Sequence, residues 1–554
     1  MVRDFVPKPI QKKYKEDRKE DRFRDGIPKY KNIKMQNLPI GISSFEKIRE
    51  EGYLYIDKTP YIHQLISTGK YYFLSRPRRF GKSLLVSTLR CLFEGRRELF
   101  KGLYIEDKWD WGKRYPVVVV DFNQINCENK RSLCSGLIHQ LSYFAQQEGL
   151  SLRGEDPQDD FKDIILSLSD KYSASVSIII DEYDKPIVSH LGLGQDRLNL
   201  ARENRELLKR FFGVIKGHDI TRITKFVLLT GVSKFSQVSI FSELNNLTDL
   251  TMGERYSAIM GITEQEMQDN LIPYIEHFAQ QRNIPLFEIK QQLKLYYNGY
   301  RFSEEDQTVY NPYSLFCALQ DKKFRNYWFE TGTPTFLIDL IKEKEYYIPK
   351  AEQLLLPDYV FRQYDLETLQ LESLLFQTGY LTIKGTEDRL YRLGYPNQEV
   401  KLSFNELLFD NLTNIPIEEK TPFYQIQSTL KQGNLSRCID LIKSLFAGIP
   451  YSISNKQDES YFYTLFYLML SGSGVFVETE VLTSDGRIDL TAHYPDTIYI
   501  FEFKCNQTAK KAIEQIKQKN YPQKYKHIDK PILLVGINFS LETKNVKEWV
   551  YENG

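Results

Sequence analysis

The sequence predicts an α/β protein with a parallel sheet in its N-terminal half. Three runs, YPVVVVDF, SVSIIIDEYD and TKFVLLTGV, are apolar without alternation, and stretches with helical spacing separate them. Continuous apolar runs of this length are typical of strands that are buried on both faces of a parallel sheet. Strands of this kind that alternate with helices indicate an α/β domain. The runs cover residues 115–122, 175–184 and 224–232.

Length and composition bound the protein class. The chain has 554 residues, which at about 150 residues per domain predicts three or four domains. It has 74 Lys+Arg and 73 Asp+Glu, so its net charge is +1. This balance excludes a uniformly basic nucleic-acid coat but allows a local basic patch. Aromatic residues make up 14% of the chain, which argues against wholesale disorder.

Cysteine spacing and hydropathy predict a cytoplasmic protein. The six cysteines include no CxxC pair, so reduced thiols are expected rather than a zinc site or a disulfide framework. The N-terminus has no apolar segment of the kind found in secretory signals. The longest uncharged apolar stretch, residues 461–477, is too short for a membrane span and contains SGSG. No membrane partner is therefore expected.

Changes in composition and pattern divide the chain into five segments. Residues 371–385 predict a helix, a glycine turn and a strand, and residues 391–404 a second strand, which together suggest a winged-helix-like module. The last segment predicts a helix, three strands, a helix and a strand. The expected segments are a charged tail (1–35), an α/β domain (36–260), a helical lid (261–345), a winged-helix-like and helical linker (346–450) and a second α/β domain (451–554).

The first motif with chemical meaning, RPRRFGKSLL, follows the strand YYFLSR and has the features of a phosphate-binding loop. Such a loop binds anionic oxygens with backbone N–H groups and a helix N-terminus. Gly81 permits close approach, Lys82 binds phosphate, and the Ser83 hydroxyl binds Mg²⁺. Arg76 stands where GxxxxGK[ST] has its first glycine, so the loop begins without glycine's access to positive φ, and Pro77 can stiffen it instead. A chance GKS in a basic turn is the alternative, which the flanking strand and helix disfavour.

Two acids at the end of a buried strand fit the same chemistry. In SIIIDEYD, Asp181 is placed to hold Mg²⁺ through water and Glu182 to orient the attacking water. Acids also cap strands for structural reasons, but a strand ending in DE downstream of GKS favours the functional interpretation. At the tip of the next strand, Thr230 is our candidate sensor of the γ-phosphate, with Ser233 or Lys234 second. A turn residue that only satisfies the backbone is equally compatible.

Four arginines are candidates for stabilising phosphate charge. Arg78 and Arg79 flank the loop, although either side chain can equally face a partner subunit or an acidic patch. Arg210 and Arg301 are weaker candidates for an arginine finger. The expected ATP-binding set is Arg78, Arg79, Phe80, Gly81, Lys82, Ser83, Asp181 and Thr230.

The C-terminal hairpin GRIDLTAHYPDTIYIFEFK predicts a second site. With its turn at YPDT, Asp489 lies opposite Glu502, and Lys504 projects from the same face. Two close carboxylates repel unless a cation lies between them, so a Mg²⁺ site suited to phosphodiester hydrolysis is expected. An ordinary surface hairpin is the alternative, which the strongly apolar strands disfavour. Glu459 can add a third carboxylate, and Gln515 can orient water or bind phosphate.

These blocks together resemble a bacterial AAA-ATPase-like family, whose members join a divergent P-loop ATPase to a C-terminal PD-(D/E)XK nuclease-superfamily domain. The matching blocks lie within residues 38–525 and include RPRRFGKSLL, IIIDEYDKPI, LTGVSKFSQVSIFSELNNLTDLT, LFQTGYLTIKG and GRIDL with FEFK. The arginine in place of the first loop glycine is similar to the pattern of this family. The resemblance implies ATP binding at Lys82 and Ser83 with Asp181 and Glu182, and a nuclease motif at Asp489, Glu502 and Lys504. It implies a P-loop parallel sheet followed by a restriction-endonuclease-like α/β domain.

The resulting expectation is an ATP-gated nuclease that uses ATP and Mg²⁺ and cleaves nucleic acid, with DNA as the favoured substrate. The expected catalytic residues are Glu182, Asp489, Glu502, Lys504 and Gln515, and the expected metal ligands are Ser83, Asp181, Asp489, Glu502 and Glu459. The alternative is a nucleotide-switched signalling or assembly ATPase whose C-terminal domain binds nucleic acid or a partner without cleaving. A nucleic-acid motor ranks last, because no helicase motif is recognisable. A homo-oligomer is compatible with each hypothesis.

Overall fold

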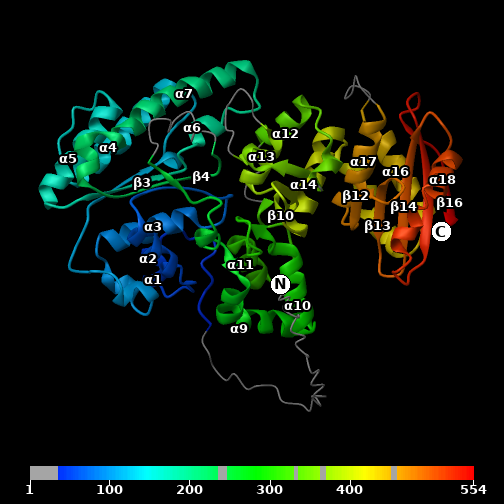
Figure 1. Ribbon diagram of the computed structural model, residues 1–554, viewed down its shortest axis with the longest axis horizontal. Coiled ribbons are helices and arrows are strands. Elements are labelled where there is room, and N and C mark those ends of the chain that lie inside the picture. The colour runs from blue at the N-terminus through cyan, green and yellow to red at the C-terminus, as the bar shows by residue number, and fades with distance from the viewer. Residues whose placement is uncertain (1–34, 235–245, 330–334, 353, 362–369, 451–457) are drawn as a thin grey trace, which may run out of the picture. The chain divides into compact units, whose positions relative to one another are not determined.

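The computed structural model describes residues 35–234, 246–329, 335–352, 354–361, 370–450 and 458–554 (Figure 1). The charged tail expected over residues 1–35 lies outside these ranges except for Met35. Within the described ranges the strands form two five-stranded and two three-stranded sheets. No helix in this part of the chain combines the length and the apolar character that a membrane span needs.

The N-terminal five-stranded sheet is parallel throughout and has the strand order β2-β3-β4-β1-β5. Strand β3 is buried along its whole length, because its residues are apolar on both faces. The parallel sheet predicted from the apolar runs is therefore confirmed. Strand β4 lies between the strand that leads into the phosphate loop and the strand that ends in Asp181. The strands are β1 (Tyr71–Ser75), β2 (Val117–Asp121), β3 (Val176–Asp181), β4 (Thr224–Gly231) and β5 (Thr248–Asp249).

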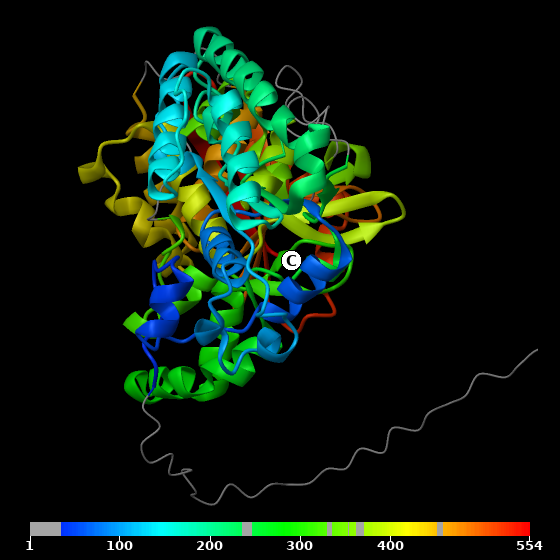
Figure 2. The ribbon, with the colours of Figure 1, turned by 90° about the vertical axis from the view of Figure 1, so that its left-hand side faces the viewer.

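Eight α-helices accompany this sheet in the described residues up to β4. Helix α3 begins directly after Gly81 and packs on β3. Helix α4 begins at a capping box, in which Asn129 accepts the N–H of Ser132 and Ser132 accepts that of Asn129. Helices α4, α5 and α7 pack against one another, as the cyan and green helices of Figure 2 show. The helices are α1 (Phe45–Glu50), α2 (Thr59–Thr68), α3 (Lys82–Phe93), α4 (Lys130–Gln147), α5 (Pro157–Tyr172), α6 (Lys185–Val188), α7 (Gln195–Gly213) and α8 (His218–Ile223).

The next segment is mainly helical and has its own hydrophobic core. A small antiparallel sheet in the order β6-β8-β7 accompanies three helices. Leu38, Leu54 and Ile56 from the start of the described chain contribute to this core. The elements are β6 (Ile262–Thr263), α9 (Glu264–Arg282), α10 (Leu286–Tyr297), β7 (Tyr300–Arg301), β8 (Thr308–Tyr310) and α11 (Pro312–Asp321).

The following segment contains the helix and hairpin expected of a winged-helix-like module, although its second strand is shorter than predicted. The sequence predicts a strand over residues 391–404, but β11 ends at Gly394 and a helix begins at Gln398. Asn397 accounts for the difference, because its side chain accepts the N–H of Val400 and so caps a new helix. The elements are α12 (Thr335–Glu343), β9 (Leu354–Pro357), α13 (Leu371–Thr378), β10 (Thr382–Glu387), β11 (Leu390–Gly394), α14 (Gln398–Thr413), α15 (Thr421–Lys431) and α16 (Leu435–Ala447).

The C-terminal sheet is mixed and has the order β12-β13-β14-β15-β16, in which only β14 and β15 are parallel. Helices α17 and α18 cover opposite faces (Figure 1): Phe466 of α17 packs on Phe503, whereas Ile513 of α18 packs in the separate cluster that contains Ile500. The sequence predicts four strands in this segment, and β16 is a fifth strand that was not predicted. The elements are α17 (Glu459–Gly472), β12 (Val477–Leu482), β13 (Arg487–His493), β14 (Ile498–Cys505), α18 (Ala509–Gln518), β15 (Ile532–Ser540) and β16 (Asn545–Asn553).

Arg76, at the position of the missing loop glycine, is a buried structural residue. Its guanidinium is 1% exposed, donates to the carbonyls of Thr251 (2.8 Å) and Tyr256 (3.1 Å), and lies 4.2 Å from the ring centre of Phe302. Burial lowers its pKa to about 9, against the opposing effect of Asp249. The left-handed positions of the loop are Arg79 and Gly81, so position 76 does not need glycine. Arg76 instead anchors the start of the loop to the segment after β5.

We predict that Arg76→Ala destabilises the protein by roughly 2–4 kcal/mol, because two buried carbonyls lose their donors and a large side chain leaves a void. Urea unfolding of the full chain measures this. The neighbouring Arg78→Ala is the matched control, since Arg78 is exposed. Equal unfolding midpoints for the two variants would show that Arg76 is not an anchor.

Candidate nucleotide site and candidate nuclease site

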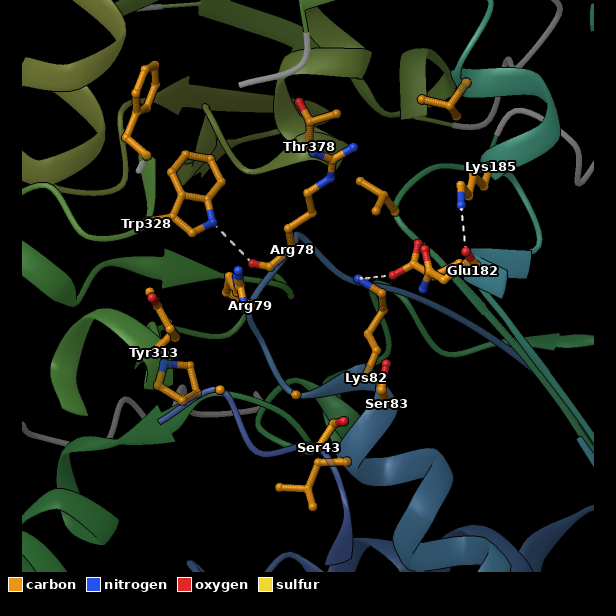
Figure 3. A pocket seen from close by; sticks show the side chains of 18 of the residues that line it. Ser43, Arg78, Arg79, Lys82, Ser83, Glu182, Lys185, Tyr313, Trp328 and Thr378 are labelled. Atoms are coloured by element: carbon orange, nitrogen blue, oxygen red, sulfur yellow. Dashed lines mark hydrogen bonds and ion pairs between the residues drawn. The ribbon is translucent and has the colours of Figure 1, made fainter. Parts of the chain in front are cut away.

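A pocket of about 770 Å³ lies over the phosphate loop, and we call it the phosphate-loop pocket. The loop and the residues after β3 give the pocket its charged side chains, and apolar residues from several segments, among them Trp328, line it as well (Figure 3). The lining includes Arg78, Lys82, Ser83, Glu182, Trp328 and Phe336.

The loop has the backbone that phosphate binding requires. Gly81 has φ +96°, and no atom of the described residues lies within 4 Å of the point where a Cβ would stand, so the loop is open on that side. Lys82 opens α3 and is buried, and its Nζ donates to the carbonyls of Arg76 and Pro77. A helix N-terminus, an open glycine and a converging lysine fit a polyphosphate.

Asp181 joins three elements below this loop. Its carboxylate accepts the Ser83 hydroxyl of α3 at 2.8 Å and the Thr230 hydroxyl of β4. Glu182, in the left-handed conformation with φ 52°, forms an ion pair with Lys82 at 3.2 Å. The structure thus brings together the four predicted residues Lys82, Ser83, Asp181 and Glu182. A hydroxyl and a carboxylate in contact are oxygen donors of the kind that suits Mg²⁺.

Thr230 lies near the end of β4, beside the strand that ends in Asp181, as expected. It is 0% exposed, and its hydroxyl is turned to Asp181 and does not line the pocket. The second candidates are also engaged below the surface: Ser233 donates to Asp184 at 2.6 Å, and Lys234 forms an ion pair with Asp249 at 2.6 Å. These contacts make Thr230 a support for Asp181, and its role as a sensor stays a prediction.

Of the four predicted arginines, the two that flank the loop lie at the pocket. Arg78 and Arg79 line the pocket; the Arg79 guanidinium lies 4.7 Å from the ring centre of Tyr313. Phe80 packs away from the pocket against Tyr300, with 4.7 Å between ring centres.

The two weaker finger candidates lie elsewhere. Arg301 is buried and donates to the carbonyl of Ser303, and Arg210 lies in a different hollow beside Lys130 and Arg131. Neither lines the phosphate-loop pocket.

Sequence analysis missed Asp184, a buried carboxylate in the wall of the same pocket. It accepts the N–H of Ser233 at 2.7 Å and the N–H of Val232, and so holds the turn after β4. Burial, with a smaller contribution from the charge of Glu182, raises its pKa to about 6. The signal was present in the sequence, since DEYD contains a third acid after the strand.

A second cleft, of about 700 Å³, lies at the C-terminal sheet, and we call it the carboxylate cleft. Its walls come from β12, β13, β14, the start of α17 and a segment before β9. The lining residues are Tyr347, Pro349, Lys350, Glu459, Ser460, Tyr463, Glu480, Leu482, Arg487, Asp489 and Phe503.

Asp489 lies where the β13–β14 ladder is interrupted. The ladder pairs Leu490 with Phe501, and beyond this pair the Asp489 carboxylate accepts the N–H of Phe503 at 2.9 Å. The register thus agrees with the predicted alignment of Asp489 with Glu502. Burial raises the pKa of Asp489 to about 6; Glu480 and Glu459 act in the same direction, whereas the Phe503 N–H and Lys504 oppose it.

Glu502 is the most buried acid of the site, with 1% of its side chain exposed. One carboxylate oxygen is 3.0 Å from Lys504 Nζ, and the other has no hydrogen-bond partner among the described residues. Burial and then the charge of Asp489 raise its pKa to about 8, although Lys504 and Gln515 on α18 partly oppose this. The predicted residues Asp489, Glu502, Lys504 and Gln515 therefore lie close enough to act on one another.

Two further acids line the cleft with Asp489. Glu459, the predicted accessory, is the first residue of α17. Glu480 on β12 was missed by sequence analysis, although it faces Asp489 across the ladder, since Thr479 pairs with Leu490 and Val481 with Ile488. It forms an ion pair with Arg487 at 2.5 Å. An exact register for β12 was needed to find it.

The donor chemistry of this site fits a divalent cation. A buried carboxylate oxygen of Glu502 without a partner, beside a second carboxylate, is a charge that Mg²⁺ neutralises well. Among the described residues, no group of three or more His, Cys, Asp and Glu side chains is already assembled at metal-binding geometry. The residues that would hold the ion are Asp489 and Glu502, with Glu459 or Glu480 beside them.

Comparisons with known proteins match the two parts of the chain that contain these candidate sites. Residues 39–241 match the family model described as "Predicted AAA-ATPase", and residues 457–549 match that of the PD-(D/E)XK nuclease superfamily. A curated protein from Azotobacter chroococcum mcd 1, described as "Uncharacterized protein in vnfD 5'region", is 38% identical over 530 residues. The alignment covers 94% of this chain and 99% of that protein.

A phosphate loop on a parallel sheet, joined in one chain to a carboxylate hairpin on a mixed sheet, defines a P-loop ATPase fused to a nuclease-superfamily domain. The chain belongs to the family of AAA-ATPase-like proteins with a C-terminal PD-(D/E)XK domain.

We predict that Glu502→Gln stabilises the metal-free protein more at pH 9 than at pH 6. The folded-state pKa of Glu502 is about 8, above its ordinary value of 4.5. Its contribution to stability is therefore present at low pH and is lost as the pH rises through about 8. Melting temperatures in EDTA at the two pH values test this against the exposed control Glu542→Gln. The same small difference from wild type at both pH values would contradict the burial argument.

Proposed function

We propose that this protein hydrolyses ATP, and that ATP controls an Mg²⁺-dependent nuclease in its C-terminal domain that cleaves DNA. The observation that carries the proposal is the buried Glu502 carboxylate with Asp489 and Lys504 beside it. A folded domain gains nothing from a buried, partly unpartnered acid next to another acid unless a cation belongs there. The assembled phosphate loop in the same chain supplies the ATP part of the proposal.

In the phosphate-loop pocket, the ion pair between Lys82 and Glu182 links binding to activation. A phosphate chain in the loop would compete with Glu182 for Lys82, because both are anions and Glu182 already lies 3.2 Å from the Lys82 ammonium. Glu182 is then available to orient and deprotonate water. Ser83 and Asp181 would hold Mg²⁺, which neutralises phosphate charge. Arg78 and Arg79 line the same pocket and can stabilise the charge that develops on the transferred phosphoryl group.

In the carboxylate cleft, Asp489 and Glu502 would hold the metal and Lys504 would position the nucleophile. Mg²⁺ bound there activates water and neutralises the charge of the pentavalent phosphorus. Lys504 donates to Glu502 and to the Phe503 carbonyl, so its ammonium group is fixed beside both acids. Gln515 lies near Glu502 and can orient water.

Nucleic acid can contact the rim of the cleft. Arg487 and Lys350 line it and carry the positive charge that attracts phosphates. A cluster of lysines lies on and after α18, and Lys510, Lys511 and Lys519 of this cluster are exposed. In that cluster, Lys517 forms an ion pair with Glu552, and Lys524 donates to the Leu482 carbonyl. DNA binding that weakens steeply with salt would support these contacts.

We predict that Glu182→Gln lowers the kcat for ATP hydrolysis by about 10²–10⁴-fold while ATP still binds, because only the general base is removed. Lys82→Ala should lose both binding and hydrolysis. Phosphate release and the binding of a fluorescent ATP analogue measure the two effects. The exposed Glu128→Gln is the matched control. If Glu182→Gln hydrolyses ATP as fast as wild type, Glu182 is not the general base.

We predict that the wild-type protein cleaves plasmid and linear DNA in the presence of Mg²⁺ and ATP, and that Lys504→Ala and Asp489→Asn do not. Incubation with and without ATP, followed by gel electrophoresis, tests both the cleavage and its control. The exposed Lys294→Ala, outside both matched ranges, should cleave like wild type. If wild type leaves DNA and RNA intact but assembles with ATP, as light scattering measures, the alternative of a nucleotide-switched assembly protein is supported instead.

A further inference from the structure

One short segment, residues 335–352, lines both the phosphate-loop pocket and the carboxylate cleft. It consists of α12 (Thr335–Glu343), a turn and the 3-10 helix η7 (Ile348–Glu352), and we call it the α12–η7 segment. Its residues lie outside both matched ranges, 39–241 and 457–549. The nine residues of α12 span roughly 13 Å, so this helix makes up much of the length of the α12–η7 segment.

The first end of the α12–η7 segment meets the ATPase part. Phe336 lines the phosphate-loop pocket. Gly192, in the turn that follows α6, lies against the same point, since a Cβ there would stand 2.5 Å from the Phe336 carbonyl oxygen. Helix α6 itself begins directly after Asp184. A rearrangement of the residues after β3 therefore pushes directly on the start of α12.

The other end completes the nuclease part. The Tyr347 hydroxyl donates to Glu480 at 2.9 Å, and its ring lies 5.7 Å from that of Tyr463. The Tyr463 hydroxyl donates in turn to the Asp489 carbonyl. One tyrosine thus contacts, directly or through one neighbour, two of the acids that line the cleft.

The far end is also attached to the nuclease part and to α14. The Pro349 carbonyl accepts the Thr479 hydroxyl of β12 at 2.8 Å. Glu352 forms an ion pair with Lys401 of α14 at 2.7 Å and accepts the Tyr467 hydroxyl of α17 at 2.6 Å. A shift of α12 along its axis therefore moves Tyr347 relative to the carboxylates or strains these bonds.

We propose that Tyr347 is a positioning residue for the carboxylates of the nuclease site, and that the α12–η7 segment transmits the state of the phosphate-loop pocket to it. This inference rests on the proposed function and assigns the path of its control. Tyr347 orients Glu480 and, through Tyr463, the backbone of Asp489. Its hydroxyl is bonded to a carboxylate beside the proposed metal ligands, so we expect it to act on metal affinity and not on the chemical step.

The first experiment measures Mg²⁺ binding to the full chain by calorimetry in the absence of nucleotide. Tyr347→Phe removes only the hydroxyl and should weaken Mg²⁺ binding about 10–100-fold. Losses of this size are usual when a residue that hydrogen-bonds to a metal ligand is mutated. Tyr359→Phe, an exposed tyrosine shortly after the segment, should bind like wild type. Melting temperatures in EDTA confirm that both variants fold. Equal Mg²⁺ affinities in the two variants would overturn the positioning role.

The second experiment follows hydrogen exchange of the backbone N–H groups over residues 336–350 with and without a non-hydrolysable ATP analogue. In wild type the analogue should change the exchange rates at 345–350 by roughly tenfold. In Lys82→Ala it should change nothing. An analogue that binds wild type but leaves residues 345–350 unaffected would overturn the transmission role.

The outcomes separate this inference from the proposed function. If wild type cleaves no nucleic acid, the proposed nuclease fails, whereas Mg²⁺ affinity and hydrogen exchange still decide the role of Tyr347. If wild type cleaves DNA under ATP control but Tyr347→Phe keeps both its Mg²⁺ affinity and its response to ATP, the proposed function stands and the path through the α12–η7 segment is wrong.

Discussion

The hydroxyl hydrogen bonds from Ser83 and Thr230 to one carboxylate, Asp181, hold the nucleotide site together. Asp181 ends a strand buried on both faces, so its charge has little access to water and needs partners from the protein. Those partners come from the helix after the phosphate loop and from the neighbouring strand. The loop, the acids and the sheet therefore keep one relative geometry, and Glu182 is held next to Lys82 as a consequence.

The C-terminal site also contains a buried carboxylate, but its charge is compensated less completely. Glu502 is as buried as Asp181, but Lys504 and the nearby Gln515 do not keep its pKa near the ordinary value. The N-terminal carboxylate is satisfied by hydroxyls, whereas the C-terminal carboxylates remain destabilised. Under the proposed function we therefore expect the second site to depend on a cation, and its stability and metal affinity to change with pH.

Much of this arrangement could be predicted from the sequence because it depends on local patterns. Continuous apolar runs predicted β2, β3 and β4, and counting outward from the YPDT turn aligned Asp489 with Glu502. Contacts between distant segments could not be predicted in this way. The partners of Arg76 lie beyond β5, the direction of the Thr230 side chain depends on β3, and Glu480 needed the register of a third strand. The second strand ended earlier than predicted because the Asn397 side chain accepts the N–H of Val400, three residues later, and so begins a helix.

The wall that Tyr347, Pro349 and Lys350 give to the carboxylate cleft has a consequence for how such proteins evolve and can be engineered. The acids belong to the nuclease-superfamily domain, but part of the cavity that surrounds them does not. A chimera joined at residue 457 would inherit the catalytic motif without the surface that completes it. The domain is therefore not a portable module, and exchange between relatives is expected to preserve the central segment together with the C-terminal domain.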